Sequence, residues 1–219
     1  PLSPKSLDYK GVYSYNTWDE SAMISAMKEL VRFNEQLFPN VEKSVYVPPS
    51  NVLSPEGRAV LTHEIPEVKT IASTYFPGDF AYAQEFEWAA DGMVEQPRVI
   101  SGGIIDDFMQ LAAFSELNLH FVNSHFIHPD DPLDTDRGAE LGWGTLKKNL
   151  EHYISWLKES APSLRDLTGS QLSGAVQRYA ALAPKQEVTS TGIQWTFENF
   201  YDEVYLFVRI NVGQVGSHV

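Results

Sequence analysis

Apolar residues recur at a spacing of three or four in several separate segments, and this spacing predicts amphipathic helices. Residues 18–38 show the pattern most clearly, and Asp19 or Ser21 can cap the start of that helix. Ser54 and Pro55 have the residue types expected at the N-cap and the first position of a second helix. Further helices are predicted over residues 104–117, 140–160 and 170–182.

Short runs rich in β-branched and aromatic residues lie between these helices and predict strands. These runs cover residues 44–47, 68–74 and 118–126. The pair Asp91-Gly92 marks a turn inside residues 79–103, which show no clear period. After Pro184 the pattern becomes β-rich, and residues 188–199 and 203–212 alternate without a helix between them.

Alternation of strands and helices from residue 10 to residue 180 is typical of an α/β fold, either a barrel or an open parallel sheet. This segment contains about three predicted strands, fewer than a complete barrel needs. We therefore expect an α/β domain over residues 1–185, with further strands upstream. Residues 186–219 are expected to begin a β-rich, sandwich-like domain.

The composition narrows the classes of function. The 219 residues are 43% hydrophobic and 12% aromatic, which is typical of a folded globular protein. A net charge of −13 argues against nucleic acid or an anionic membrane surface as a partner and favours a neutral or cationic substrate. The absence of cysteine excludes disulfides and thiolate zinc sites, and fits either redox compartment. No apolar run approaches the roughly 20 residues that span a bilayer.

The start of the chain suggests a piece of a longer protein. The sequence begins at Pro1 without a methionine, and no signal-like segment follows. The missing leader therefore says nothing about targeting.

The most informative stretch is residues 118–131, which contains three of the six histidines. A strand that ends in His125-x-x-His128 and opens into an acidic loop resembles the strand ends where α/β barrels keep their chemistry. His125 and His128, with Asp130 or Asp131, form a plausible ligand set for zinc or another divalent transition metal. The alternatives are structural or exposed histidines, and aspartates that only form a turn.

Other polar residues could belong to the same site. His120 is expected on the strand face opposite His125, where it would be packed or hydrogen-bonded. Asp130 or Asp131 could be a ligand, a general base or a turn residue, whereas Asp134 and Asp136 with Arg137 are expected to tie the loop down. The expected substrate-binding rim consists of Asn51, Glu85, Arg98 and Trp143.

Two aromatic segments, residues 13–18 and 45–51, could line a sugar-binding groove, because aromatic faces stack on pyranose rings and amides bond hydroxyl groups. The alternative is that Trp18 and Tyr46 belong to the core. For Glu85 and Arg98, the plain alternative is a surface ion pair. No phosphate-binding glycine loop, Gly-x-Ser-x-Gly elbow or HExxH motif occurs.

Several motifs in order resemble a family of bacterial proteins of unassigned function. That family is similar in turn to polysaccharide deacetylases with a NodB-homology domain, carbohydrate esterase family 4. The motifs are Tyr13-Ser-Tyr-Asn-Thr, Val47-Pro-Pro-Ser-Asn, Pro97-Arg98-x-x-Ser-Gly, Ser124-His-Phe-Ile-His-Pro-Asp-Asp, Ser160-Ala-Pro-Ser-Leu-Arg-Asp-Leu-Thr-Gly-Ser and Ala175-Val-Gln-Arg-Tyr. The resemblance covers most of residues 10–180.

The resemblance to the deacetylases implies a partial (β/α) barrel and a divalent metal held by one Asp and two His, with an Asp as base and a His as acid. The sequence departs from that pattern in three places. The paired aspartates of the first deacetylase motif are not found and would lie upstream of Pro1. Residues 14–16 have no histidine where a His-x-x-x-His motif is expected, and Val47-Pro48-Pro49-Ser50 replaces the pattern Arg-x-Pro-Tyr. His125 and His128 stand instead where the superfamily carries its late Leu-x-His acid motif. Either this pair has taken over ligation, or one of its members is the acid and the metal is lost.

The sequence therefore predicts a metal-dependent hydrolase, in particular a deacetylase of a bacterial surface or exported polysaccharide, acting outside the cytoplasm. The predicted metal ligands are His125 and His128, and the predicted catalytic residues are His128, Asp130 and Asp131. The alternative is a catalytically inactive carbohydrate-binding or scaffold module in polysaccharide assembly. A cytoplasmic hydrolase of a small substrate is a third interpretation.

Overall fold

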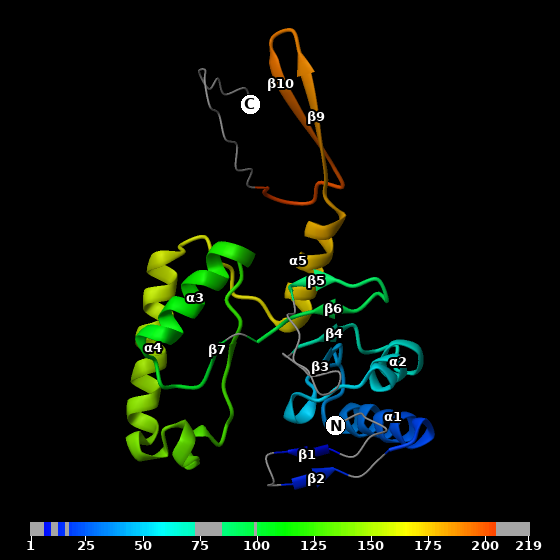
Figure 1. Ribbon diagram of the computed structural model, residues 1–219, viewed down its shortest axis with the longest axis vertical. Coiled ribbons are helices and arrows are strands. Elements are labelled where there is room, and N and C mark those ends of the chain that lie inside the picture. The colour runs from blue at the N-terminus through cyan, green and yellow to red at the C-terminus, as the bar shows by residue number, and fades with distance from the viewer. Residues whose placement is uncertain (1–6, 10–12, 16–17, 73–84, 99, 205–219) are drawn as a thin grey trace. The chain divides into compact units, whose positions relative to one another are not determined.

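The computed structural model describes residues 7–9, 13–15, 18–72, 85–98 and 100–204 (Figure 1). The chain divides into two compact units, residues 1–177 and 178–219. The α-helices are α1 (Glu20–Leu37), α2 (Pro55–Glu64), α3 (Asp107–His120), α4 (Gly142–Ser160) and α5 (Gly169–Ala181). The strands are β1 (Leu7–Tyr9), β2 (Tyr13–Tyr15), β3 (Val45–Tyr46), β4 (Thr70–Ile71), β5 (Glu87–Trp88), β6 (Val94–Glu95), β7 (Ile100–Ser101), β8 (His125–Phe126), β9 (Ala183–Thr189) and β10 (Gly192–Glu198).

The first two helices begin where local sequence signals predict. The Asp19 carboxylate accepts a hydrogen bond from the Ala22 amide at 2.8 Å and caps α1. The Ser54 hydroxyl accepts from the Gly57 amide at 3.0 Å, and Pro55 occupies the first position of α2. The predictions for both helices are confirmed.

The first unit contains a four-stranded sheet with the order β3-β4-β6-β5. β3, β4 and β6 are parallel, and β5 is antiparallel to β6. Successive residues of a strand face opposite sides. Ile71 packs into the core cluster that includes Met23, Met27 and Leu61 of α1 and α2. On the other side, the Thr70 hydroxyl bonds to Ser173 in the first half of α5.

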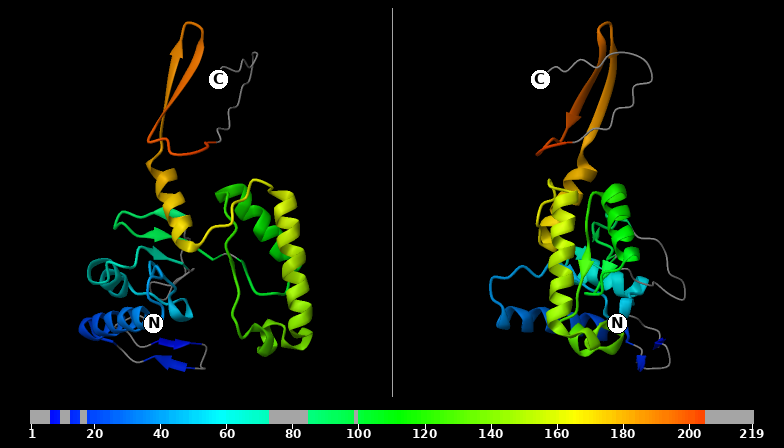
Figure 2. Two further views of the ribbon diagram at one scale, coloured as in Figure 1. Left: turned by 180° about the vertical axis from the view of Figure 1, so that it is seen from behind. Right: turned by 90° about the vertical axis from the view of Figure 1, so that its left-hand side faces the viewer.

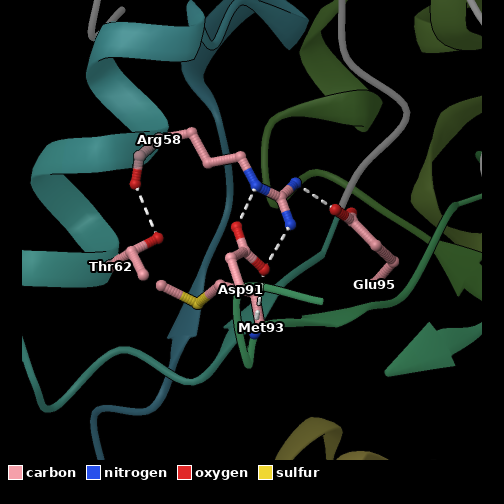
Figure 3. A network of polar contacts seen from close by, with 5 residues as sticks. All are labelled: Arg58, Thr62, Asp91, Met93 and Glu95. Carbon is pink, nitrogen blue, oxygen red and sulfur yellow. Dashed lines mark hydrogen bonds and ion pairs between the residues drawn. The ribbon is translucent and has the colours of Figure 1, made fainter. Parts of the chain in front are cut away.

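Arg58 connects α2 to the β5–β6 hairpin, as Figure 3 shows. Its guanidinium makes two bonds to Asp91, at 2.6 and 3.0 Å, and a further ion pair with Glu95. Glu95 is 3% exposed, so this network compensates a buried carboxylate. The Asp91-Gly92 turn lies where the sequence predicts it, and Gly92 has a φ of 88° that favours glycine.

A second cluster joins α3, α4 and the two-stranded parallel sheet of β7 and β8, and Figure 2 shows α3 and α4 side by side in both views. Ile100, Ala113 and Tyr153 form its buried centre. Ile105, Met109, Ala112 and Trp156 pack around them.

The predicted strand over residues 118–126 is wrong in its first half. α3 continues to His120 and ends at Phe121, which has a left-handed φ of 58°. Only His125 and Phe126 form strand β8. His120 is therefore the last residue of a helix and does not lie on a strand face opposite His125. Tertiary packing of α3 overrides the β propensity of this run.

The first unit is α/β, as predicted. The described residues form small sheets and no closed barrel. None of the helices in the described ranges has the length and apolar character needed to cross a membrane.

The second unit contains the antiparallel hairpin of β9 and β10, in which Gly192 pairs with Thr189 and Glu198 with Ala183. The predicted β-rich character is confirmed over these residues. Residues 188–199 belong to both strands of the hairpin, because the chain turns between Thr189 and Gly192. Residues 205–212 of the second predicted run lie outside the described residues.

Candidate functional site

His125 is held by backbone and aromatic contacts. Its strand β8 pairs with β7, with Ile100 opposite His125. The His125 Nε2 atom lies 2.7 Å from the Gly102 carbonyl oxygen. Because a carbonyl oxygen can only accept, Nε2 carries the hydrogen. The imidazole also meets the edge of the Tyr153 ring, at 5.2 Å between centroids. Burial lowers the pKa of His125, which favours the neutral ring.

His128 and Asp131 form a reciprocal turn directly after β8. The His128 amide donates to Asp131 Oδ2 at 3.1 Å, and the Asp131 amide donates to the His128 carbonyl at 3.1 Å. The His128 Nδ1 atom lies 3.4 Å from Asp131 Oδ1. The spacing of three residues therefore places the imidazole and the carboxylate together.

Arg137 compensates the charge of the buried Asp131. Asp131 is 5% exposed, and its Oδ1 accepts a hydrogen bond from Arg137 Nη1 at 3.1 Å. The Arg137 Nε atom also lies 3.7 Å from Asp134 Oδ2. Asp134 and Arg137 thus tie down the loop that follows β8, as the sequence suggested.

His128, Asp130 and Asp131 form a group that could hold a metal ion. One potential ligand atom from each residue lies within 4.8 Å of the other two. Two donors bound to one ion at about 2.1 Å are at most about 4.2 Å apart. The group therefore fits a divalent ion after a small contraction, and Asp130 is exposed and can make it. One imidazole and two carboxylates suit zinc or manganese by ligand chemistry.

Arg98 lies against this group through Phe126. Its guanidinium carbon is 3.9 Å from the centroid of the Phe126 ring. The Phe126 and His128 rings meet edge-on with centroids 4.1 Å apart. Burial lowers the pKa of Arg98, and the positive charge of Arg137 lowers it further. The two arginines are thus close enough to influence one another.

Asn51 positions the guanidinium of Arg98. The Asn51 Oδ1 atom accepts a hydrogen bond from Arg98 Nη2 at 3.0 Å. Asn51 ends the short 3₁₀ helix η1 (Pro49–Asn51) and has a left-handed φ of 58°. Non-glycine residues adopt this conformation at a cost, and asparagine adopts it most easily. The Val47-Pro-Pro-Ser-Asn51 segment therefore places the side-chain amide of Asn51 beside the guanidinium of Arg98.

The structure brings together four of the predicted residues in addition to His128, namely Asn51, Arg98, Asp130 and Asp131. His125 is a neighbour on β8, but the metal-capable group in the described ranges does not include it. Glu85 lies with His120 instead, at 3.3 Å between Oε2 and Nδ1. Trp143 is exposed in the first turn of α4 and takes no part in the contacts described above. Asn16 and Thr17, in the first aromatic segment, lie outside the described residues.

Glu116 is a buried polar residue that the sequence reasoning missed. It lies on α3 at the spacing of Met109 and Ala113, the face that packs toward Tyr153 of α4. A carboxylate in an apolar helix stripe was the available signal.

Comparison with known proteins gives a family but no individual relative. Neither the curated proteins nor the solved structures contain a match to the chain. The similarity to polysaccharide deacetylases therefore stays a prediction. A family match covers residues 4–218, nearly the whole sequence. The chain belongs to the bacterial family described as "Uncharacterised protein conserved in bacteria (DUF2194)".

Proposed function

We propose that the chain is a metal-dependent hydrolase that deacetylates a bacterial surface or exported polysaccharide outside the cytoplasm. The observation that supports this most is the convergence of His128, Asp130 and Asp131 within 4.8 Å at the end of β8. The proposed substrate class and the proposed partial barrel architecture rest on the order of motifs, which resembles that of polysaccharide deacetylases.

His128, Asp130 and Asp131 would hold the ion. The chemistry that a divalent ion supplies at such a site is Lewis-acid catalysis of hydrolysis. Arg137 holds the Asp131 carboxylate beside His128, so that both groups are positioned before an ion arrives. Asp130 is the exposed member of the group and would complete the ligand set when an ion binds.

Arg98 and Asn51 would form the substrate-binding edge of the site. The guanidinium and the amide are positioned by the Phe126 stack and by the hydrogen bond between them. Both groups can bond sugar hydroxyls or an acetyl carbonyl oxygen. This assigns substrate binding to two residues that are distant in sequence and adjacent in the fold.

The rival function is a carbohydrate-binding or scaffold module without catalysis. One observation favours it: both oxygens of Asp131 already accept hydrogen bonds, from the His128 amide and from Arg137. A carboxylate satisfied in this way can be purely structural. The proposed function requires Asp131 to accept an ion beside these donors.

Acetate release from acetylated polysaccharides separates the two functions. The hydrolase releases acetate with added Zn²⁺ or Mn²⁺, and both a chelator and Asp130→Asn abolish the release. Asp136→Asn is the matched control, because Asp136 is an exposed carboxylate of the same loop outside the metal-capable group. Polysaccharide binding that is indifferent to the chelator, without acetate release, contradicts the proposal and favours the module.

A further inference from the structure

The carboxyl group of Glu116 is buried at the join between α3 and β8. Glu116 is only 3% exposed. Its Oε2 atom accepts a hydrogen bond from the Ser124 amide at 3.1 Å. Its Oε1 atom is buried and has no hydrogen-bond partner among the described residues. A carboxylate in this setting is poorly compensated.

Among the residues that the structure describes, no cation pairs with the carboxyl group of Glu116. The titratable group that interacts with it from a neighbouring element is Tyr153 of α4, whose ring in turn meets the imidazole of His125 on β8. The Asn123 amide donates to the Tyr153 hydroxyl at 2.8 Å. On α3 itself, His120 lies one turn further on and pairs with Glu85. Burial raises the pKa of Glu116 to about 7, and the Ser124 hydrogen bond opposes part of this rise.

The segment that Glu116 holds is the connection to the candidate site. Phe121, the first residue after α3, has a left-handed conformation, and residues 122–124 connect it directly to β8. The bond to the Ser124 amide therefore fixes the start of the strand that ends beside His128. A change in the charge of Glu116 therefore acts directly on this connection.

We propose that Glu116 is a proton-linked positioning residue for β8. The docked connection over residues 121–124 favours the neutral carboxyl, whose carbonyl oxygen still accepts from Ser124. Ionisation places an uncompensated charge in the same site and favours release of the connection. This inference goes beyond the proposed function and does not depend on metal binding by His128, Asp130 and Asp131.

Amide hydrogen exchange of residues 121–126 tests this inference on the whole chain, without metal or substrate. Opening constants are compared at pH 6 and pH 8 after correction for the intrinsic pH dependence of exchange. With a pKa of about 7 in the docked state and about 4.3 in the open state, the Glu116 contribution raises the opening constant about tenfold between these pH values. Glu116→Gln removes this contribution, so the ratio of wild-type to variant opening constants rises about tenfold.

The comparison with the variant also cancels the opposite contribution of His125, whose lowered pKa favours opening in acid. Glu151→Gln, at an exposed glutamate of α4, is the matched control and should behave like wild type. If Glu116→Gln does not fold, Glu116→Met removes the charge at similar volume and makes the same prediction. A ratio of wild-type to Glu116→Gln opening constants that does not rise between pH 6 and pH 8 overturns the inference.

Discussion

Asp130 and Asp131 are adjacent in sequence but should differ sharply in what their charge contributes to stability. Asp131 is 5% exposed and accepts hydrogen bonds at both oxygens, whereas Asp130 is exposed. Asparagine has nearly the same shape as aspartate but replaces one oxygen with a donor. At position 131, that donor must face either the His128 amide or the Arg137 guanidinium, both of which also donate.

The expected cost of Asp131→Asn follows from these contacts. Losing a hydrogen bond to a charged group costs about 1.5–3 kcal/mol, and breaking a buried ion pair costs about 3–5 kcal/mol. The Arg137 side chain is 34% exposed, so water recovers part of the loss. We therefore expect Asp131→Asn to lower the free energy of unfolding by about 2–3 kcal/mol. Asp130→Asn should change it by less than about 0.5 kcal/mol.

Guanidinium unfolding of the two variants, in the presence of a chelator, measures both effects without a contribution from bound metal. The m-values should stay equal, so that a shift in midpoint reports stability. A difference between the variants below about 1 kcal/mol would refute the role of Asp131 as the buried anchor of this loop.

Three further changes test other parts of the structure. Arg58→Met should destabilise the chain by about 3 kcal/mol in thermal or chemical unfolding, because it leaves the buried Glu95 without its ion pair to Arg58; an unchanged midpoint would contradict this. Ser54→Ala removes the cap of α2 and should cost about 1 kcal/mol by the same assay, whereas Ser54→Gly should cost less than Ser54→Ala. The lowered pKa of His125 contributes stability that is present above about pH 6.5, the ordinary value, and is lost as the pH falls through the folded pKa. His125→Gln should therefore weaken the loss of stability between pH 7 and pH 5, and an identical pH profile would exclude this contribution.

The parts of the fold that the sequence predicts well are those with local causes. The caps at Asp19 and Ser54 and the turn at Asp91-Gly92 each depend on a few neighbouring residues. The end of α3 has no such local signal, because Phe121 adopts a left-handed conformation at a position where glycine is usual. The turn between Thr189 and Gly192 was not predicted, although Gly192 is a local signal for it.

The candidate site likewise has parts with local causes, which the sequence can predict, and parts that depend on long-range contacts. The proximity of His128, Asp130 and Asp131 follows from their spacing in one short turn, and the sequence could indicate it. The pairing of Asn51 with Arg98 joins residues 47 positions apart and depends on how the sheets are placed. The exclusion of His125 from the metal-capable group depends on the Gly102 carbonyl of the neighbouring strand end. Long-range strand pairing is not contained in local spacing.

Calorimetric titration of Zn²⁺ or Mn²⁺ into the metal-free chain tests the central claim most directly. The account predicts about one equivalent bound by wild type and by Asp136→Ala, and loss of binding in His128→Ala and Asp130→Ala. Wild type and Asp136→Ala share all three residues of the metal-capable group. Asp136→Ala therefore shows whether binding survives the removal of a carboxylate of this loop that is not a ligand. No binding by wild type, or equal binding by His128→Ala, would contradict the metal site and with it the proposed hydrolase.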